Sequence, residues 1–236
     1  MIIHKEGNNK HWETIYSFTQ VKQTITTLSF NPFTNINNSL QLIVSYSDGS
    51  MHYINYFHDT WNTKEYTSHP FGMTNLTWLP VSADSNESIS AFITAGNDCQ
   101  LKYWEISNKE VIEEKDVLEK VHNSSVFNIE CFSSESTSSV KQDSLITLDI
   151  DDEIYLWAIS RNTNNKLYEF NKPEPVKFSQ DQKPSGISQV TWSKCGAFLS
   201  ISTQEGMYLY RNVEKEWTLV SSMNNEGVMV NYEEEN

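Results

Sequence analysis

The stretch ITAGNDCQLKYW, residues 93–104, predicts the structural unit from which the chain is built. Its first part is small and apolar, and Asn97 and Asp98 follow as residues that favour a turn. The second part ends on the aromatic residues Tyr103 and Trp104, which are common in strands. The stretch therefore predicts two antiparallel strands joined by a tight turn.

The same hairpin pattern occurs four times along the chain. The other copies read IVSYSDGSMHYI (43–54), ITLDIDDEIYLW (146–157) and LSISTQEGMYLY (199–210). Aligned without a gap, the turn position holds Asp48, Asp98, Asp151 and Gln204, and the closing bulky position holds Ile54, Trp104, Trp157 and Tyr210. Successive turn positions are 50, 53 and 53 residues apart. A period of about 40–50 residues with a Trp closing one strand is typical of WD repeats, so we predict an all-β, open WD-repeat β-propeller.

The repeat divides the chain into about four complete blades and the tail of a preceding one. We expect a partial propeller over residues 1–222, with a blade tail at 1–18 and blades at 19–68, 69–121, 122–172 and 173–222. The acidic residues 223–236 are expected to form a flexible tail. The segment Asn108–Val121 has apolar residues at helical spacing. We nevertheless predict an outer strand and loop there, because tertiary context overrides local propensity.

The composition restricts the classes of ligand. The chain carries 31 acidic and 17 basic residues, a formal net charge of −14, and it has no run rich in Lys or Arg. Direct binding of nucleic acid or anionic membranes is therefore disfavoured, because phosphate binding needs clustered basic side chains. Cys99, Cys131 and Cys195 are spaced for neither a zinc knuckle nor a disulfide framework. No apolar run approaches the ~18 residues of a membrane span, and no cofactor is expected.

Two blades carry a recurring set of polar residues. A His precedes the inner strand, a Thr lies in the next strand, an Asp lies at the turn and a Trp ends the third strand. The sets are His69, Thr94, Asp98 and Trp104, and His122, Thr147, Asp151 and Trp157. We predict a buried hydrogen-bond chain from the Trp indole to the Thr hydroxyl, to the His ring and on to the Asp carboxylate. The other two blades lack this His, and the last also has Gln204 in place of the Asp. We expect these blades to be held mainly by packing and to open more easily.

Other interpretations of these residues were weaker. A catalytic group of His, Asp and Thr is disfavoured because the same trio occurs twice at matched positions, as expected of a structural repeat. The run 149–153, DIDDE, could bind calcium, but it lacks the glycine and the distal Glu of an EF-hand loop. A tight turn between two strands explains it. We therefore predict a protein that is not an enzyme and that holds no metal.

Longer stretches resemble one family of WD-repeat propellers. Residues 187–220, ISQVTWSKCGAFLSISTQEGMYLYRNVEKEWTLV, are similar to the last blade of the Sec-thirteen family. MTNLTWLPV (73–81) with AFITAGNDCQLKYWEI (91–106) resembles its middle blade. LEKVHNSSVFNIECF (118–132) with SLITLDIDDEIYLWAIS (144–160) resembles the blade after that. Residues 1–30 resemble the end of its second blade and the start of its third, so the resemblance covers nearly the whole chain.

The resemblance implies a scaffold. Members of this family form an open six-bladed propeller, which a partner completes by inserting strands between the last blade and the first. The implied partner is a helical-solenoid subunit, either of the outer cage of the COPII vesicle coat in ER-to-Golgi transport or of the nuclear-pore Y-complex. The implied location is the cytosolic face of ER exit sites and COPII vesicles, or the nuclear pore. Strand insertion fits the unpaired backbone groups along the edges of an open propeller.

The chain departs from the family pattern because the first blade and most of the second are absent. We expect it to be a fragment, or a divergent protein that replaces these blades with another chain. The last blade would form one half of the docking groove. Partner-binding residues expected there are Ile187, Val190, Trp192, Tyr208, Tyr210 and Trp217.

Two alternatives stay open. One is the related Seh-one propeller of the nuclear pore and of amino-acid signalling, which uses the same insertion with a different solenoid. The other is another WD-repeat interaction scaffold, which would need a closed ring of blades.

Overall fold

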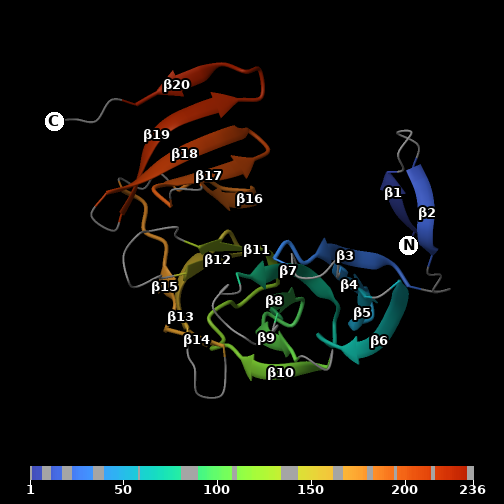
Figure 1. Ribbon diagram of the computed structural model, residues 1–236. Coiled ribbons are helices and arrows are strands. Elements are labelled where there is room, and N and C mark those ends of the chain that lie inside the picture. The colour runs from blue at the N-terminus through green and yellow to red at the C-terminus, as the bar shows by residue number, and fades with distance from the viewer. Residues whose placement is uncertain are drawn as a thin grey trace.

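The computed structural model describes residues 2–6, 12–17, 23–33, 40–57, 59–80, 90–107, 111–133, 143–161, 167–179, 183–193, 196–213 and 216–232. These residues form five antiparallel sheets and contain no α-helix (Figure 1). The outer strand predicted within Asn108–Val121 is present as β10, Ile112–Val117. Residues 108–110 of that segment lie outside the described residues.

Four of the sheets are meanders in which each strand pairs with the next along the chain, except that the short last strand of the third blade pairs with the third strand of that blade. The first blade contains β3 (Ile25–Phe30), β4 (Leu40–Tyr46), β5 (Ser50–Phe57) and β6 (Thr60–Thr67). The second contains β7 (Met73–Leu79), β8 (Ser90–Gly96), β9 (Leu101–Ile106) and β10. The third contains β11 (Val126–Ser133), β12 (Asp143–Asp149), β13 (Ile154–Arg161), β14 (Tyr168–Phe170) and β15 (Glu174–Pro175). The last contains β16 (Ile187–Trp192), β17 (Phe198–Thr203), β18 (Gly206–Val213), β19 (Glu216–Asn224) and β20 (Met229–Asn231).

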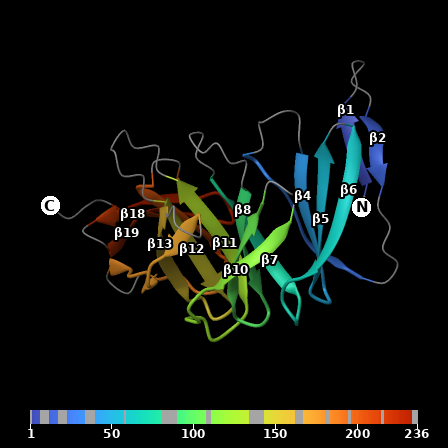
Figure 2. The same cartoon turned by 60° about the horizontal axis from the view of Figure 1, so that its bottom comes forward.

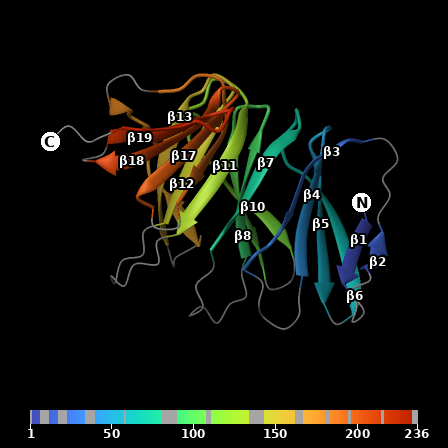
Figure 3. The same cartoon turned by 90° about the horizontal axis from the view of Figure 1, so that it is seen from above.

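The blades stand side by side around their first strands. Contacts join β3 to β7, β7 to β11, and β11 to β16. The sheets follow one another from the N-terminal to the C-terminal side without closing into a ring (Figures 2 and 3). This arrangement is the predicted open β-propeller.

Each pair of neighbouring blades encloses an apolar core. Side chains alternate between the two faces of a strand, so a blade between two others must be apolar on both faces. Between the first and second blades, Tyr53 packs with Trp78 and Trp104. Between the third and last blades, Ile146 packs with Tyr210 in the same way. Full burial of one such large side chain contributes about 1.5–3 kcal/mol, so these interfaces hold the arc of blades together.

A separate hairpin of β1 (Ile2–Glu6) and β2 (Trp12–Ser17) covers part of the first blade. Ile3 packs in a buried cluster with residues of β4 and β5. The ring of Tyr16 stacks on Trp61 with centroids 4.5 Å apart. The hairpin leaves β3 uncovered on the same face, where Leu28 and Phe30 are 45% and 43% exposed. The inner strand of the first blade therefore presents an apolar row without a neighbouring strand among the described residues.

The hairpin turns of the first three blades share one backbone conformation. Gly49, Cys99 and Asp152 occupy equivalent positions and have φ of 87°, 61° and 64°. Such a left-handed residue closes a short turn between two strands. The predicted tight turns are therefore present in these blades.

The fourth hairpin differs from the other three by one residue. Although the sequences align without a gap, only residues 204–205 connect β17 to β18, and Tyr210 pairs with Leu199 rather than with Phe198. In the second blade the equivalent Trp104 pairs with Phe92, which aligns with Phe198. The register of the last hairpin is thus shifted by one, which sends the polar residue Ser200 to the opposite face.

The expected flexible tail is partly ordered into the last blade. β19 extends to Asn224, and β20 pairs antiparallel with it. The Asn224 side chain accepts hydrogen bonds from the backbone N–H groups of Glu226 (3.1 Å) and Val228 (2.9 Å), which fixes the connecting turn. The prediction of a flexible tail is therefore wrong up to residue 231. Residues 233–236 lie outside the described residues.

The expected boundary between the third and last blades also differs. β15 pairs with β13 of the third blade, although it falls within the segment 173–222 that was assigned to the last. The chain then crosses over, and Trp217 N–H donates to the carbonyl of Lys177 at 2.8 Å. Segment 174–179 therefore fastens two blades together.

Replacing Gly49 with Ala should reveal how tightly the first turn packs on the next blade. The added Cβ would lie 1.8 Å from the His69 carbonyl oxygen, at a left-handed φ. We expect G49A to lower the free energy of unfolding by about 3 kcal/mol or more, because steric conflict adds to the cost of about 1–2 kcal/mol for the backbone conformation. G186A is the matched control, since Gly186 has φ of 65° and nothing within 4 Å of its added Cβ. Urea unfolding measures both variants. If G49A and G186A lose the same free energy of unfolding, the close contact between Gly49 and the His69 carbonyl is absent.

Candidate functional site

The first polar set lies buried between the start of β7 and the β8–β9 hairpin. The Trp104 indole N–H donates to the Thr94 hydroxyl at 2.9 Å, and that hydroxyl lies 2.9 Å from His69 Nε2. On the other side of the ring, Nδ1 lies 2.8 Å from the Asp98 carboxylate. The structure thus brings the four predicted residues of this blade into one chain of contacts.

The second set forms the same chain but takes its carboxylate from another residue. Trp157 donates to Thr147 at 3.0 Å, and Thr147 lies 2.8 Å from His122 Nε2. His122 Nδ1 lies 2.8 Å from Asp149. Asp151 is exposed at the turn, so its assignment to this chain is wrong.

The residue at one position of the hairpin explains this difference. Gly96 and Asp149 align, and a Cβ on Gly96 would lie only 2.4 Å from the His69 ring. Without that side chain, Asp98 can reach back from the turn to His69. In the third blade Asp149 itself fills this space, and it also accepts the backbone N–H groups of Asp151 and Glu153. The His ring thus meets a carboxylate in both blades, but the carboxylate comes from Asp98 in the second blade and, in the third blade, from Asp149, which lies two residues earlier in the aligned hairpin.

The donors and acceptors determine the protonation state of both histidines. A Trp indole can only donate and a carboxylate can only accept, so Nδ1 carries the proton and the Thr hydroxyl donates to Nε2. Burial lowers the pKa of His69 and of His122, outweighing the opposing effect of the neighbouring carboxylates. Both rings are therefore neutral at pH 7.

The geometry of the two chains fits a structural role. Both rings are almost fully buried, and both of their nitrogens face partners. A general base needs a nitrogen that can reach a substrate, and neither ring offers one. The chains hold the segment before each inner strand against the following hairpin.

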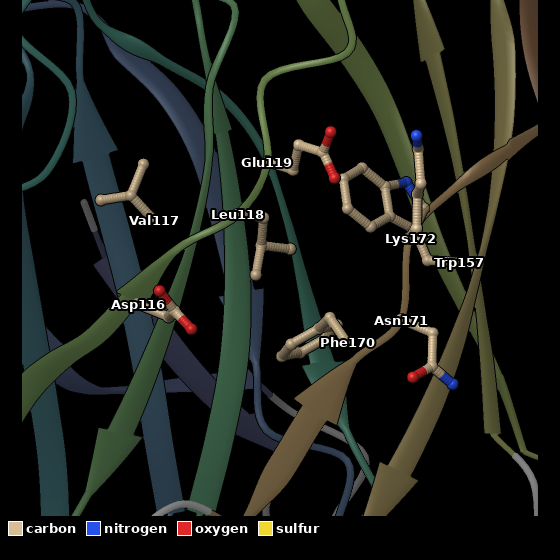
Figure 4. A pocket seen from close by; sticks show the side chains of 8 residues that line it. All are labelled: Asp116, Val117, Leu118, Glu119, Trp157, Phe170, Asn171 and Lys172. Atoms are coloured by element: carbon tan, nitrogen blue, oxygen red, sulfur yellow. The ribbon is translucent and has the colours of Figure 1, made fainter.

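A crevice of about 210 Å³ lies between the second and third blades (Figure 4). It is lined by Asp116, Val117, Leu118, Glu119, Trp157, Phe170, Asn171 and Lys172. Leu118 and Trp157 belong to the core cluster between the two blades, against which Phe170 packs. The crevice is therefore a gap between outer strands with room for little more than one side chain, and its lining shows no catalytic group of residues.

Neither a metal site nor a membrane span is seen in the part of the chain that the structure describes. No three His, Cys, Asp or Glu side chains there lie close enough to hold a metal ion. No helix in that part is long and apolar enough to cross a membrane.

The expected partner-binding residues of the last blade face inward. Ile187, Val190, Tyr210 and Trp217 are buried in the cluster shared with the third blade, and Trp192 and Tyr208 pack against it. These six residues therefore contribute to the core between the third and last blades. Sequence patterns show which residues of a strand share a face, but they do not show which of two apolar faces a neighbouring blade covers.

The opposite face of the last blade carries a row of methionines that the sequence analysis did not identify. Met207 pairs with Met223, and Met223 pairs with Met229, so the three side chains lie side by side across β18, β19 and β20. Met207 and Met229 are 41% and 62% exposed. Methionine is adaptable and common at binding surfaces. The sequence signal was available only after β20 was known to be a strand.

Comparison with known proteins tests the resemblance to the Sec-thirteen family. No protein-family model matches the chain. The chain is 26% identical over 160 residues to the protein SEC13 homolog of Caenorhabditis briggsae. The resemblance to the Sec-thirteen family is confirmed. The match covers 67% of this chain and 48% of the relative, so this Sec13-like chain matches about half of the relative's length.

Asp149 and Asp151 of the Sec13-like chain form a matched pair for mutation. D149N should lower the free energy of unfolding by about 1–3 kcal/mol, because the amide replaces an acceptor that faces the buried His122 N–H. D151N should change it by less than about 0.5 kcal/mol, since Asp151 is exposed. Urea unfolding at pH 7.5 measures both. A larger loss in D151N would restore the original assignment.

Stability should fall as the pH drops from 7.5 to 5.5. Burial lowers the folded-state pKa of His52, His69 and His122 below the ordinary value of about 6.5. The unfolded chain then binds more protons than the folded chain between the two pKa values, so their contribution is present above about pH 6.5 and is lost below it. The urea midpoint should therefore be lower at pH 5.5.

The half-buried Glu130 acts in the opposite direction. Burial raises its pKa, so its contribution to stability is lost as the pH rises. In E130Q the urea midpoint should therefore fall between pH 7.5 and 5.5 at least as steeply as it does in the parent. A midpoint that is constant or rises on acidification in E130Q would contradict the prediction of neutral buried histidines.

Proposed function

We propose that this chain is a non-enzymatic scaffold that binds a helical-solenoid subunit by accepting strands beside its last blade. The solenoid is one of the COPII outer coat or of the nuclear-pore Y-complex. Its place of action is then the cytosolic face of ER exit sites and transport vesicles, or the nuclear pore. The similarity to a SEC13 homolog supports this proposal.

The observation that carries the proposal is the uncovered outer face of the last blade. Met207, Leu209 and Met223 lie on the face opposite the core, and Met229 extends the row to the edge strand. Exposed apolar side chains of this size on a sheet face mark an interaction site. Added strands would bury them as the third blade buries the opposite face.

The edge of the same blade also suits added strands. β20 pairs with β19 on one side, and the sheet ends there within the described residues. The backbone groups along an edge strand can pair with an extended segment of another chain. Both the face and the edge of the last blade are therefore available to a partner's strands.

The uncovered row on β3 supports the same architecture from the other end of the arc. Ile25, Leu28 and Phe30 are each at least 40% exposed. In a propeller this face packs against the preceding blade, as β7 does against β3. Further β-structure, from the same polypeptide or from a partner, would bury this row.

Charged substitutions in the methionine row test the proposal. The chain is co-expressed with either solenoid subunit from its own organism, and the affinity of the purified components is measured by calorimetry. We expect one of the two solenoids to bind the parent chain. The double variant M207D with M229D should weaken that binding at least about 100-fold, because two carboxylates would be buried against apolar surface.

V117D is the matched control. Val117 is 43% exposed at the end of β10 in the second blade, away from the last blade, and it should tolerate the charge without loss of binding. The proposal fails if neither solenoid binds the parent chain. It also fails if the methionine variant binds as tightly as V117D.

A further inference from the structure

Two exposed apolar residues lie away from the open ends of the arc. Phe71 is 70% exposed and Ile150 is 63% exposed, the highest values among the large apolar residues that the structure describes. Phe71 lies in the segment before β7, and Ile150 lies at the turn between β12 and β13. Neither residue is on a sheet face that a neighbouring blade would cover. The absence of an adjacent blade therefore does not explain their exposure.

Hydrogen bonds place both residues on one continuous surface of turns. The Asn97 side-chain amide donates to the Phe71 carbonyl at 2.8 Å. The Ser125 hydroxyl donates to the Asn97 side-chain oxygen at 2.7 Å, and the Ile150 N–H donates to the Ser125 carbonyl at 3.1 Å. Four segments from the second and third blades are thus linked in a row. We call this row, from Phe71 to Ile150, the turn face.

The turn face is held rigidly on both sides. Gly49 packs against the His69 backbone, and the Asn97 N–H donates to the Gly72 carbonyl at 3.1 Å. Beyond Ile150, the Asp152 carboxylate accepts the N–H groups of Gly186 (2.7 Å) and Ile187 (2.8 Å). A preorganised surface loses little conformational entropy on binding. The exposed side chains at this position are therefore suited to be anchors.

The charge around the turn face is negative. The four hairpin turns, residues 47–49, 97–100, 150–153 and 204–205, contain no Lys or Arg. Asp48, Asp151, Glu153 and Glu205 lie exposed on them. Lys183 approaches from the next segment but pairs with Glu153 at 3.2 Å. A ligand of this surface should therefore be basic.

We infer that the turn face binds a basic linear segment of a partner protein, with two bulky apolar side chains of that segment packing on Phe71 and Ile150. The lysine and arginine side chains of the segment lie toward Asp48 and Asp151. This surface is separate from the methionine row of the last blade. The propeller can therefore hold a solenoid at its open edge and a basic segment on its turns.

Fluorescence anisotropy with synthetic peptides tests this inference on the 236-residue chain. One fluorescein-labelled peptide has Leu and Phe separated by Lys, Arg and Ser, and a second has Glu in place of every basic residue. The basic peptide should bind saturably in the micromolar to submillimolar range at 50 mM salt and more weakly at 300 mM. The acidic peptide should bind at least about tenfold more weakly.

Variants then locate the site. F71A with I150A should weaken binding of the basic peptide at least about tenfold, since two apolar contacts are lost. The control V213A removes a smaller exposed apolar side chain at the end of β18, and it should leave binding unchanged. Circular dichroism and melting temperature check that both variants fold, as expected for exposed sites.

The outcomes are distinct from those of the solenoid experiment. M207D with M229D should leave peptide binding unchanged, and F71A with I150A should leave solenoid binding unchanged. The inference is overturned if the basic peptide does not bind, if the acidic peptide binds equally well, or if F71A with I150A binds as the parent does.

Discussion

Every blade is a twisted sheet with two apolar faces, and it can bury them only against neighbouring blades. This constraint explains the cores between successive sheets, in which Tyr53 meets Trp104 and Ile146 meets Tyr210. It also explains why the surfaces at the two ends of the arc are apolar. The β1–β2 hairpin packs against β4, β5 and β6 of the first blade but leaves β3 exposed. An open propeller therefore has the same kind of surface at its ends as in its interior, and that surface favours completion by further strands.

Apolar faces position the sheets, but they do not fix the loops between them. In the second and third blades the loops are fixed by two buried chains of contacts, each from a Trp through a Thr and a His to a carboxylate. In the last blade the register shift places Leu199 opposite Tyr210, and apolar packing takes this role. Buried polar chains stabilise only when every member has a partner. The middle of the arc thus has defined turns, on which Asn97 and Ser125 can link adjacent blades.

The sequence was sufficient to predict the repeat, the open propeller and seven of the eight residues in the polar chains. It could not distinguish Asp149 from Asp151, because both are aspartates near the same turn and the choice depends on the space beside the ring. The Gly at position 96 was the available signal. The alignment also hid the one-residue shift of the last hairpin, which only strand pairing reveals. Which apolar face of the last blade lies outward depends on the placement of the third blade, so no local pattern could identify the methionine row.

Two kinds of exposed apolar residue remain, and they have different physical causes. Those on sheet faces, such as Phe30 and Met207, follow from the architecture, because any blade at the end of an arc must expose the face that a neighbour would cover. Phe71 and Ile150 have no such cause, since turns in a propeller face solvent whether or not the ring is complete. A polar residue at either position would cost the fold little. Their exposure on a rigid, acidic surface is therefore better explained by binding than by folding.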